Sequence, residues 1–271
     1  DHLKTLPASV KFITEDGHGV QDNATMARAF AICTQKDITV MSHAEDMEIS
    51  PWDYRLAEDI ETVRNCWLSE YYQTKLHMCH VSTRGALDAI QMAKLRGAPV
   101  TCEVTPHHLW FDDSRLQYKV NPPIRKADDV AALVTAIKDG TVSCIGTDHA
   151  PHSSDKKDVE FERAANGISS IEIAFPLIWT HLVETGRFTL SEIVSIMSCN
   201  PAELLRIDRG SLSVGKVADV LIFDPETERA VNPQEFYSKG KNCPYIGEVL
   251  RGWPSMVLRA GRVVLKNGAI V

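Results

Sequence analysis

Residues 142–152 read VSCIGTDHAPH, a short apolar run that leads directly into Asp148, His149 and His152. Four earlier runs of the same kind end in the same way. They read ITEDG at 13–17, VMSHA at 40–44, MCHVS at 78–82 and VTPHH at 104–108. Each run is typical of a buried strand, and each places an acidic or imidazole side chain just after that strand. This recurrence decides the fold that we predict.

Longer helical patterns separate the five strands, which we place at residues 10–13, 38–41, 76–81, 100–104 and 142–146. Helices are predicted over 24–35, 53–72, 84–96 and 129–138, and two more over 168–184 and 190–197. In the second of them, Leu56, Ile60, Val63 and Trp67 share one face. Alternating strands and helices indicate an α/β fold with a parallel sheet. We predict a (β/α)₈ barrel of the TIM type that is N-terminally incomplete, because eight strands close a barrel and five are present.

From about residue 210 the sequence pattern changes to short strands and turns. The clearest predicted strands are residues 217–223 and 256–265. We therefore predict a barrel domain over residues 1–208, carrying barrel strands 4 to 8. Residues 209–271 are predicted to form the C-terminal part of a small β-rich domain that returns to the barrel. The length of 271 residues suits one barrel with an appendage.

Composition excludes several classes of function. The net charge of -7 argues against a nucleic-acid partner, since no basic stripe is present to release counterions. No apolar run approaches the roughly 20 residues that cross a bilayer, so we expect a soluble protein without membrane contact. The seven cysteines form an odd set without a C-x-x-C pair, which favours a reducing, cytoplasmic compartment. We expect them to be small buried side chains.

The candidate metal-binding and catalytic residues lie at the ends of the predicted strands. In a parallel barrel all strand carboxyl ends converge on one mouth, so residues far apart in the sequence would meet there. Histidines with carboxylates and no clustered cysteines suit zinc or a comparable divalent ion with an open position for water. Such a metal site is suited to hydrolysis, because the metal activates a water molecule while a carboxylate moves the proton to the leaving group. Asp148 is our candidate for that carboxylate.

Some of these residues have plainer interpretations. Asp16 precedes Gly17, and Asp-Gly is a common turn dipeptide. Lys11, if carbamylated, could bridge two metals. Lys11 and Asp16 differ by an odd number of positions, so a regular strand cannot point both into the mouth, and we choose Asp16. His18 and His77 have no strand-end position, and we expect both at the surface.

Asn121 and Arg125 lie on either side of two prolines in a predicted loop. Their amide and guanidinium groups suit a substrate that bears a carboxylate. Composition alone favours a plainer interpretation, an ordinary loop with a solvated arginine.

At this point the sequence resembles a known family. The strings TDHAPH (147–152), EVTPHH (103–108), NPPIR (121–125), SHAED (42–46) and GISSIEIAFP (167–176) are similar to those of dihydroorotases of the type that bridges its metals with aspartate. These enzymes belong to the metal-dependent hydrolases of the amidohydrolase superfamily. GSLSVGKVADVLIFD (210–224) is similar to the tail of many amidohydrolases, where it enters a small β-sandwich.

Carried over position by position, the resemblance implies a role for each matching residue. One or two zinc ions would be held by Asp16 as the bridge, His43 and His80 on one metal, and Asp148 on the other. Asp148 would also serve as acid and base. The substrate would be held by Asn121 and His152, with backbone near Gly167 assisting.

The implied reaction is the reversible cyclisation of N-carbamoyl-L-aspartate to L-dihydroorotate in de novo pyrimidine biosynthesis, carried out by a metal-activated hydroxide. The implied partners are a small-molecule substrate, a second copy in a homodimer, or aspartate carbamoyltransferase.

One departure leaves alternatives open. The family opens its barrel with a His-x-His-x-Arg strand that supplies two further metal ligands, and this string is missing here. We expect a fragment that holds at most one metal properly. A related cyclic amidase such as allantoinase or hydantoinase is one alternative, and a carbamylated lysine on the fourth strand would favour it. A non-catalytic dihydroorotase-like scaffold for aspartate carbamoyltransferase is the other.

Overall fold

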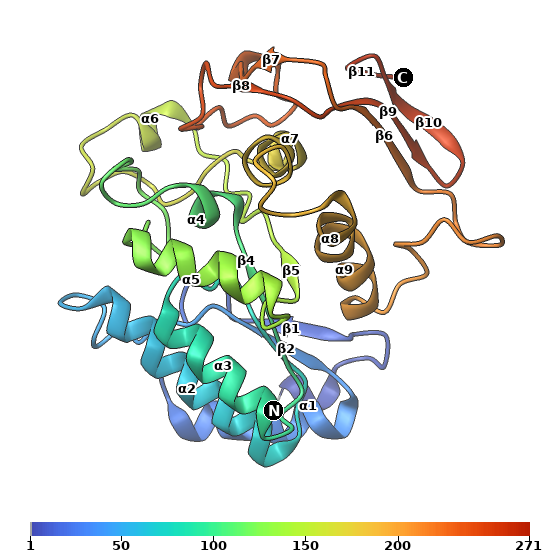
Figure 1. The fold of residues 1–271 in the computed structure, drawn as a ribbon. Coiled ribbons are helices and arrows are strands. Elements are labelled where there is room, and N and C mark those ends of the chain that lie inside the picture. Colours follow the sequence, from blue (N-terminus) through green and yellow to red (C-terminus); the bar gives the residue numbers. More distant parts are fainter. Residues whose placement is uncertain (1) are drawn as a thin grey trace. The chain divides into compact units, whose positions relative to one another are not determined.

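The computed structural model describes residues 2–271, and Figure 1 traces their path. The chain folds into two compact units. The first comprises the residues up to Gln117 together with Asn121–Gly146, and the second comprises Tyr118–Val120 and Thr147–Val271. The boundary that we predicted between residues 208 and 209 stays a prediction.

The first unit is built on a five-stranded sheet in the order β1-β2-β3-β4-β5. Its strands are β1 (Phe12–Thr14), β2 (Thr39–Ser42), β3 (Leu76–Met78), β4 (Val100–Val104) and β5 (Cys144–Ile145). Every neighbouring pair is parallel, with Val40 aligned to Leu76 and Leu76 to Val100. The predicted α/β class with a parallel sheet is therefore confirmed, and the carboxyl ends of its strands share one edge.

Helices follow the strands. They are α1 (Asn23–Lys36), α2 (Tyr54–Tyr72), α3 (Arg84–Leu95), the short α4 (Pro106–Trp110) and α5 (Ala127–Lys138), after a 3₁₀ turn η1 at His2–Thr5. Helices α1, α2, α3 and α5 lie where the sequence pattern predicted them, whereas η1 and α4 were not predicted. Asp22, Asp53 and Thr83 begin α1, α2 and α3, because each side chain accepts hydrogen bonds from backbone N–H groups of the first turn.

Strand alternation separates an apolar layer from a polar one. Leu76, Met78, Val100, Cys102 and Val104 are fully or almost fully buried, and β3 and β4 contact α2 and α3. The residues between them in sequence project to the other face of the sheet. The surface position that we predicted for His77 is wrong for this reason: the side chain is buried on that second face.

Helix α2 turns its polar side inward. Ile60, Val63 and Trp67, which the sequence places on one face with Leu56, are exposed, whereas the buried residues of α2 are Ala57, Glu58, Glu61, Thr62, Asn65, Cys66 and Ser69. An amphipathic helix on a sheet ordinarily buries its apolar stripe. In α2 the stripe faces away from the sheet, so hydrogen bonds must hold the inner side.

The second unit begins with a largely irregular segment. It contains α6 (Ser154–Lys157) and α7 (Ala174–Ile178), which continues into a π-helical turn, η2 (Trp179–Val183). A second helical stretch consists of α8 (Leu190–Val194), a π-helical turn η3 (Ser195–Cys199) and α9 (Asn200–Leu204). The predicted helix over 168–184 thus begins later, at Ala174.

Residues 220–270 of the second unit contain the strands of two antiparallel sheets. One has the order β11-β10-β9-β6, from β6 (Val220–Asp224), β9 (Trp253–Arg259), β10 (Arg262–Lys266) and β11 (Ala269–Ile270). The other pairs β7 (Arg229–Ala230) with β8 (Val249–Leu250), and the 3₁₀ turn η4 (Pro233–Glu235) lies between them in sequence. The strand predicted over 256–265 is wrong in one respect. Ala260 and Gly261 have positive φ angles of 49° and 78° and turn the chain, so two strands form a hairpin.

All seven cysteines are free thiols. Five of them are buried, namely Cys33, Cys66, Cys102, Cys144 and Cys243, and burial raises the pKa of each. Their burial agrees with the prediction of small buried side chains, whereas Cys79 is half-buried and Cys199 is exposed. Within residues 2–271, none of the helices combines the length and apolar character that a membrane span requires.

Candidate metal centre

Asp16, His43 and His80 come together at the carboxyl edge of the sheet. They follow β1, β2 and β3 respectively, and one ligand atom of each lies within 4.8 Å of the others. Both histidines are buried, while Asp16 is exposed. The sheet edge therefore brings together three of the four residues that the sequence analysis named as metal ligands.

The ligand atoms face one another. His43 Nδ1 lies 3.1 Å from His80 Nε2, and His80 Nε2 lies 4.0 Å from Asp16 Oδ1. The nearby imidazole of His80 holds the pKa of Asp16 below its ordinary value, against the opposing effect of burial. Two imidazole nitrogens and an ionised carboxylate form a donor set that suits zinc and similar divalent ions.

Glu45 fixes the tautomer of His43. Its Oε2 lies 3.0 Å from His43 Nε2 and also accepts a hydrogen bond of 2.9 Å from Asn121 Nδ2. A carboxylate at Nε2 requires the proton there, which leaves the lone pair on Nδ1, the atom that faces His80. Burial acts to raise the pKa of Glu45, but hydrogen bonds from His43, Asn121 and Tyr54 outweigh it and hold the value at about 2.

Two of the predicted metal ligands have unusual backbone conformations. His80 has φ 35° and Asp148 has φ 44°, both in the left-handed region that non-glycine residues rarely adopt. The other described non-glycine residues with positive φ end helices or turn hairpins: Asp37, Gln73, Arg206, Ala260 and Asn267. Strained backbone away from such positions is concentrated at functional sites.

The inner face of α2 holds the turn that carries His43 and Glu45. Asn65 Nδ2 donates to Ser42 Oγ at 2.9 Å, and Glu61 Oε2 accepts from the backbone N–H of Glu45 at 3.0 Å. These contacts come from residues four positions apart, on one side of the helix. The polar interior of α2 thus positions the first histidine of the centre.

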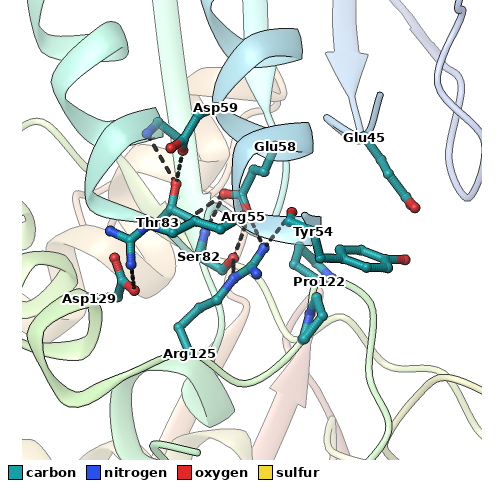
Figure 2. A network of polar contacts seen from close by, with 12 residues as sticks. Glu45, Tyr54, Arg55, Glu58, Asp59, Ser82, Thr83, Pro122, Arg125 and Asp129 are labelled. Atoms are coloured by element: carbon teal, nitrogen blue, oxygen red, sulfur yellow. Dashed lines mark hydrogen bonds and ion pairs between the residues drawn. The ribbon is translucent and has the colours of Figure 1, made fainter. Parts of the chain in front are cut away.

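Glu58, on the same face of α2, joins two further loops, as Figure 2 shows. It accepts from the backbone N–H groups of Ser82 and Thr83, at 2.8 and 3.3 Å, just after His80. It also accepts from Arg125 at 2.9 Å, and Arg125 Nε donates to Ser82 Oγ at 2.9 Å. The buried guanidinium therefore ties the Asn121 loop to the His80 loop. The prediction of a solvated Arg125 is wrong, because sequence composition cannot identify a buried partner.

Imidazole groups after β4 support the same loop. His108 Nε2 lies 3.0 Å from the carbonyl oxygen of Pro122, and His108 Nδ1 lies 2.8 Å from Thr105 Oγ1. Burial lowers the pKa of His108 to about 4, so the ring is neutral near pH 7 and donates one hydrogen bond to the loop. Its neighbour His107 is also buried, and burial lowers its pKa well below the ordinary value.

A second group, which the sequence analysis missed, lies on β3 and β4. His77, Cys79 and Glu103 each offer a ligand atom within 4.8 Å of the others. His77 Nδ1 lies 2.8 Å from Thr101 Oγ1, and His77 Nε2 lies 3.3 Å from Glu103 Oε2. Strand parity could have found this group, because aligned residues of neighbouring parallel strands share a face.

Asp148, His152 and Gly167 belong to the second unit. His152 Nε2 lies 2.7 Å from the carbonyl oxygen of Asn166, and the His152 backbone N–H donates to Asn242 Oδ1 at 2.7 Å. Gly167 has φ 137°, and a Cβ atom there would lie 2.6 Å from the carbonyl oxygen of Ala150, so only glycine fits. The roles of these three residues toward metal or substrate stay predictions.

Comparison with known proteins identifies relatives over almost the whole chain. A model of the amidohydrolase family matches residues 7–264. The dihydroorotase of Geobacter metallireducens is 40% identical over 94% of this chain, and that of Listeria monocytogenes serovar 1/2a is 37% identical over 95%. The chain spans 65% of the length of each of these two proteins.

Solved structures with the same fold are named for other activities, hydantoinase and dihydropyrimidinase. A D-hydantoinase (dihydropyrimidinase) from Thermus sp. superposes with a TM-score of 0.87 at 25% identity, over 96% of this chain and 64% of its own. A dihydropyrimidinase from Brevibacillus agri superposes with a TM-score of 0.88 at 24% identity, with the same coverage. The fold of the chain is that of these hydrolases.

Replacing Arg125 by methionine should destabilise the protein in a pH-dependent way. In the wild type, burial acts to raise the pKa of Glu58, but Arg125 and Ser82 outweigh it and hold the pKa below the ordinary value. The ionised pair therefore stabilises the fold above the unfolded pKa, and this contribution is lost as the pH falls through the lowered folded pKa. Without its cation the buried Glu58 has a raised folded pKa. The unpaired carboxylate therefore lowers the free energy of unfolding of the variant above that pKa, and this loss shrinks as the pH falls below it.

We expect the free energy of unfolding to fall by about 3–5 kcal/mol near neutral pH and by less at about pH 5. Urea denaturation at both pH values measures the difference. Arg163→Met, at an exposed arginine, is the matched control, and the double variant Glu58→Gln/Arg125→Met should recover part of the loss. An equal deficit at both pH values would show that Glu58 is not the group left unpaired.

Proposed function

The chain belongs to the amidohydrolase family, and from that premise we propose that it acts as a dihydroorotase. The proposed reaction is the reversible cyclisation of N-carbamoyl-L-aspartate to L-dihydroorotate. The observation that carries the proposal is that Asp16, His43 and His80 meet at one sheet edge. The relatives named dihydroorotase align with this chain over 94% and 95% of its length, at 40% and 37% identity.

We propose that the ion held by Asp16, His43 and His80 is zinc, and that Asp148 is a ligand of a second one. The donor set of two imidazoles and carboxylates, without cysteine, fits a catalytic rather than a structural zinc site. Bound there, zinc would supply Lewis acidity toward the amide that is cleaved or formed and would lower the pKa of a water molecule.

The other proposed roles follow from the chemistry of the side chains. Glu45 keeps His43 in the tautomer that leaves Nδ1 as the ligand atom. Asn121 donates through Nδ2 to Glu45, while its buried Oδ1 has no hydrogen-bond partner among the described residues and suits a substrate N–H group. We assign proton transfer to Asp148, which would take the proton from the attacking water and deliver it to the leaving nitrogen. His152 and the backbone near Gly167 complete the proposed substrate contacts.

A hydantoinase-type cyclic amidase is the second candidate, because the solved structures described above are named for that activity. Sequence identity is higher to dihydroorotases than to these structures. Lys11, the lysine next to β1, is exposed and lies outside the Asp16 group. The retained ligands also weigh against a scaffold role. Cytoplasmic localisation is part of the proposal, supported by the seven free thiols.

The direct test is metal content together with a substrate panel, measured on the polypeptide expressed from its complete reading frame. We expect bound zinc by elemental analysis and hydrolysis of L-dihydroorotate, with little turnover of hydantoin, dihydrouracil or allantoin. Turnover should cease on removal of zinc by a chelator and return when zinc is added. Preference for hydantoin would establish the second candidate, and the absence of both metal and turnover would leave the scaffold alternative.

Asp148→Asn should abolish turnover without unfolding the protein. The substitution preserves volume but removes the proton acceptor, and general acid-base catalysis contributes roughly 10²–10⁴-fold to rates. Steady-state kinetics with dihydroorotate and a circular dichroism melt measure the two effects separately. Asp155→Asn, at an exposed aspartate of α6, is the control and should retain wild-type rates. Wild-type turnover in Asp148→Asn would remove Asp148 from the mechanism.

Glu45→Gln should weaken zinc binding by about 10–100-fold, the usual cost of losing a carboxylate behind a metal-binding histidine. Competition with a chromophoric chelator measures the zinc dissociation constant without any dependence on activity. Glu48→Gln, at an exposed glutamate three residues away, should bind zinc like the wild type. Unchanged affinity in Glu45→Gln would mean that His43 needs no carboxylate partner.

A further inference from the structure

The polar face of the sheet holds a second set of possible metal ligands. His77 lies on β3, Cys79 follows that strand directly, and Glu103 lies on the neighbouring strand β4. One ligand atom of each lies within 4.8 Å of the other two. We call this group the β3–β4 triad. None of its three side chains has a role in the reaction proposed above.

The spacing of the triad already fits a metal ion. His77 Nε2 lies 3.3 Å from Glu103 Oε2. Zinc binds imidazole nitrogen and carboxylate oxygen at about 2.0–2.2 Å, and a tetrahedral angle then places two such atoms about 3.4 Å apart. An ion could therefore replace the proton between these two groups without any movement of either side chain. A thiolate as the third ligand favours zinc over magnesium or calcium.

The contacts around His77 fix which of its nitrogens is the ligand. Nδ1 lies 2.8 Å from Thr101 Oγ1, so Nε2 is the nitrogen that faces Glu103. The Thr101 hydroxyl donates in turn to the carbonyl oxygen of Leu76 at 3.3 Å, which leaves it able to accept the Nδ1 proton. Histidines that bind metals ordinarily donate their other N–H group to an oxygen in this way. His77 therefore has the outer contact of a metal ligand.

The surroundings of the triad leave room for the carboxylate and a route for an ion. At Gly146 an added Cβ atom would lie 2.5 Å from both carboxylate oxygens of Glu103, so the glycine provides the space that this group occupies. The side chain of His77 is fully buried, whereas that of Glu103 is 20% exposed and Cys79 is half-buried. An ion can therefore reach the buried imidazole from the side of the other two ligands.

We propose that the β3–β4 triad binds a zinc ion of its own, distinct from the ion at Asp16, His43 and His80. Three protein ligands leave the fourth tetrahedral position to a water molecule. Binding converts the Cys79 thiol to a thiolate and releases its proton to water. The two sites differ in chemistry, because only the triad contains sulfur.

Cobalt(II) is the probe that separates the two sites. A thiolate ligand gives bound cobalt a strong charge-transfer absorption in the near ultraviolet, which imidazole and carboxylate ligands do not. We expect this band when the metal-free polypeptide, expressed from its complete reading frame and kept reduced, is titrated with cobalt. Cys79→Ser should lose the band. Cys199→Ser, at an exposed cysteine, is the matched control and should keep it.

A second variant perturbs the site while leaving all three ligands in the chain. In Gly146→Ala the new methyl group would displace the Glu103 carboxylate, which lies at the end of a flexible side chain. We expect the cobalt dissociation constant of the triad to rise at least about 10-fold, as it does when support around a metal ligand is lost. Circular dichroism melts of both variants check that each one is folded.

Asp16→Asn keeps this test independent of the proposed reaction. It removes a ligand of the candidate metal centre and should leave the cobalt–thiolate band unchanged, whatever happens to turnover. Absence of the band in the wild type, or its survival in Cys79→Ser, would overturn the proposal and leave His77 and Glu103 as a hydrogen-bonded pair. Loss of the band in Asp16→Asn would contradict a separate site, because the two groups would then share one ion.

Discussion

The structure depends on the buried polar side of α2. Glu58, Glu61 and Asn65 lie against the loops that follow the strands, where an unpaired carboxylate would be strongly destabilising. Each is matched by a specific group: Arg125 for Glu58, the Glu45 backbone and Arg64 for Glu61, and Ser42 for Asn65. Because the partners come from the loops that carry His43, His80 and Asn121, satisfying the helix also fixes the candidate metal centre.

This dependence explains which features were predictable. The positions of Asp16, His43 and His80 at one sheet edge follow from strand polarity alone, since parallel strands end on the same side. Helix bounds follow from local signals, such as the capping aspartates before α1 and α2. Such features require no knowledge of which residues meet in space.

Three of the features that were not predicted depend on the identity of a tertiary partner. Periodicity identified the apolar stripe of α2 but not its outward direction, because that direction is set by carboxylates whose partners lie up to 67 residues away in sequence. The burial of Arg125 and of His77 has the same origin, in Glu58 for the first and in Thr101 and Glu103 for the second. The hairpin turn at Ala260 was missed because alanine carries no turn signal in sequence, whereas Gly261 after it does.

Because the polar side of α2 faces the sheet, the helix is held there by hydrogen bonds and ion pairs rather than by burial of its apolar stripe. Each hydrogen bond contributes only about 0.5–1.5 kcal/mol net, because the unfolded chain makes comparable bonds to water. Apolar burial, at about 25 cal/mol per Å², is the larger favourable term for most helices, and in α2 the side chains that could provide it face away from the sheet. The polar partners of Glu58, Glu61 and Asn65 must therefore hold α2 in place, so the contacts that position the candidate metal centre are also the ones that keep the helix on the sheet.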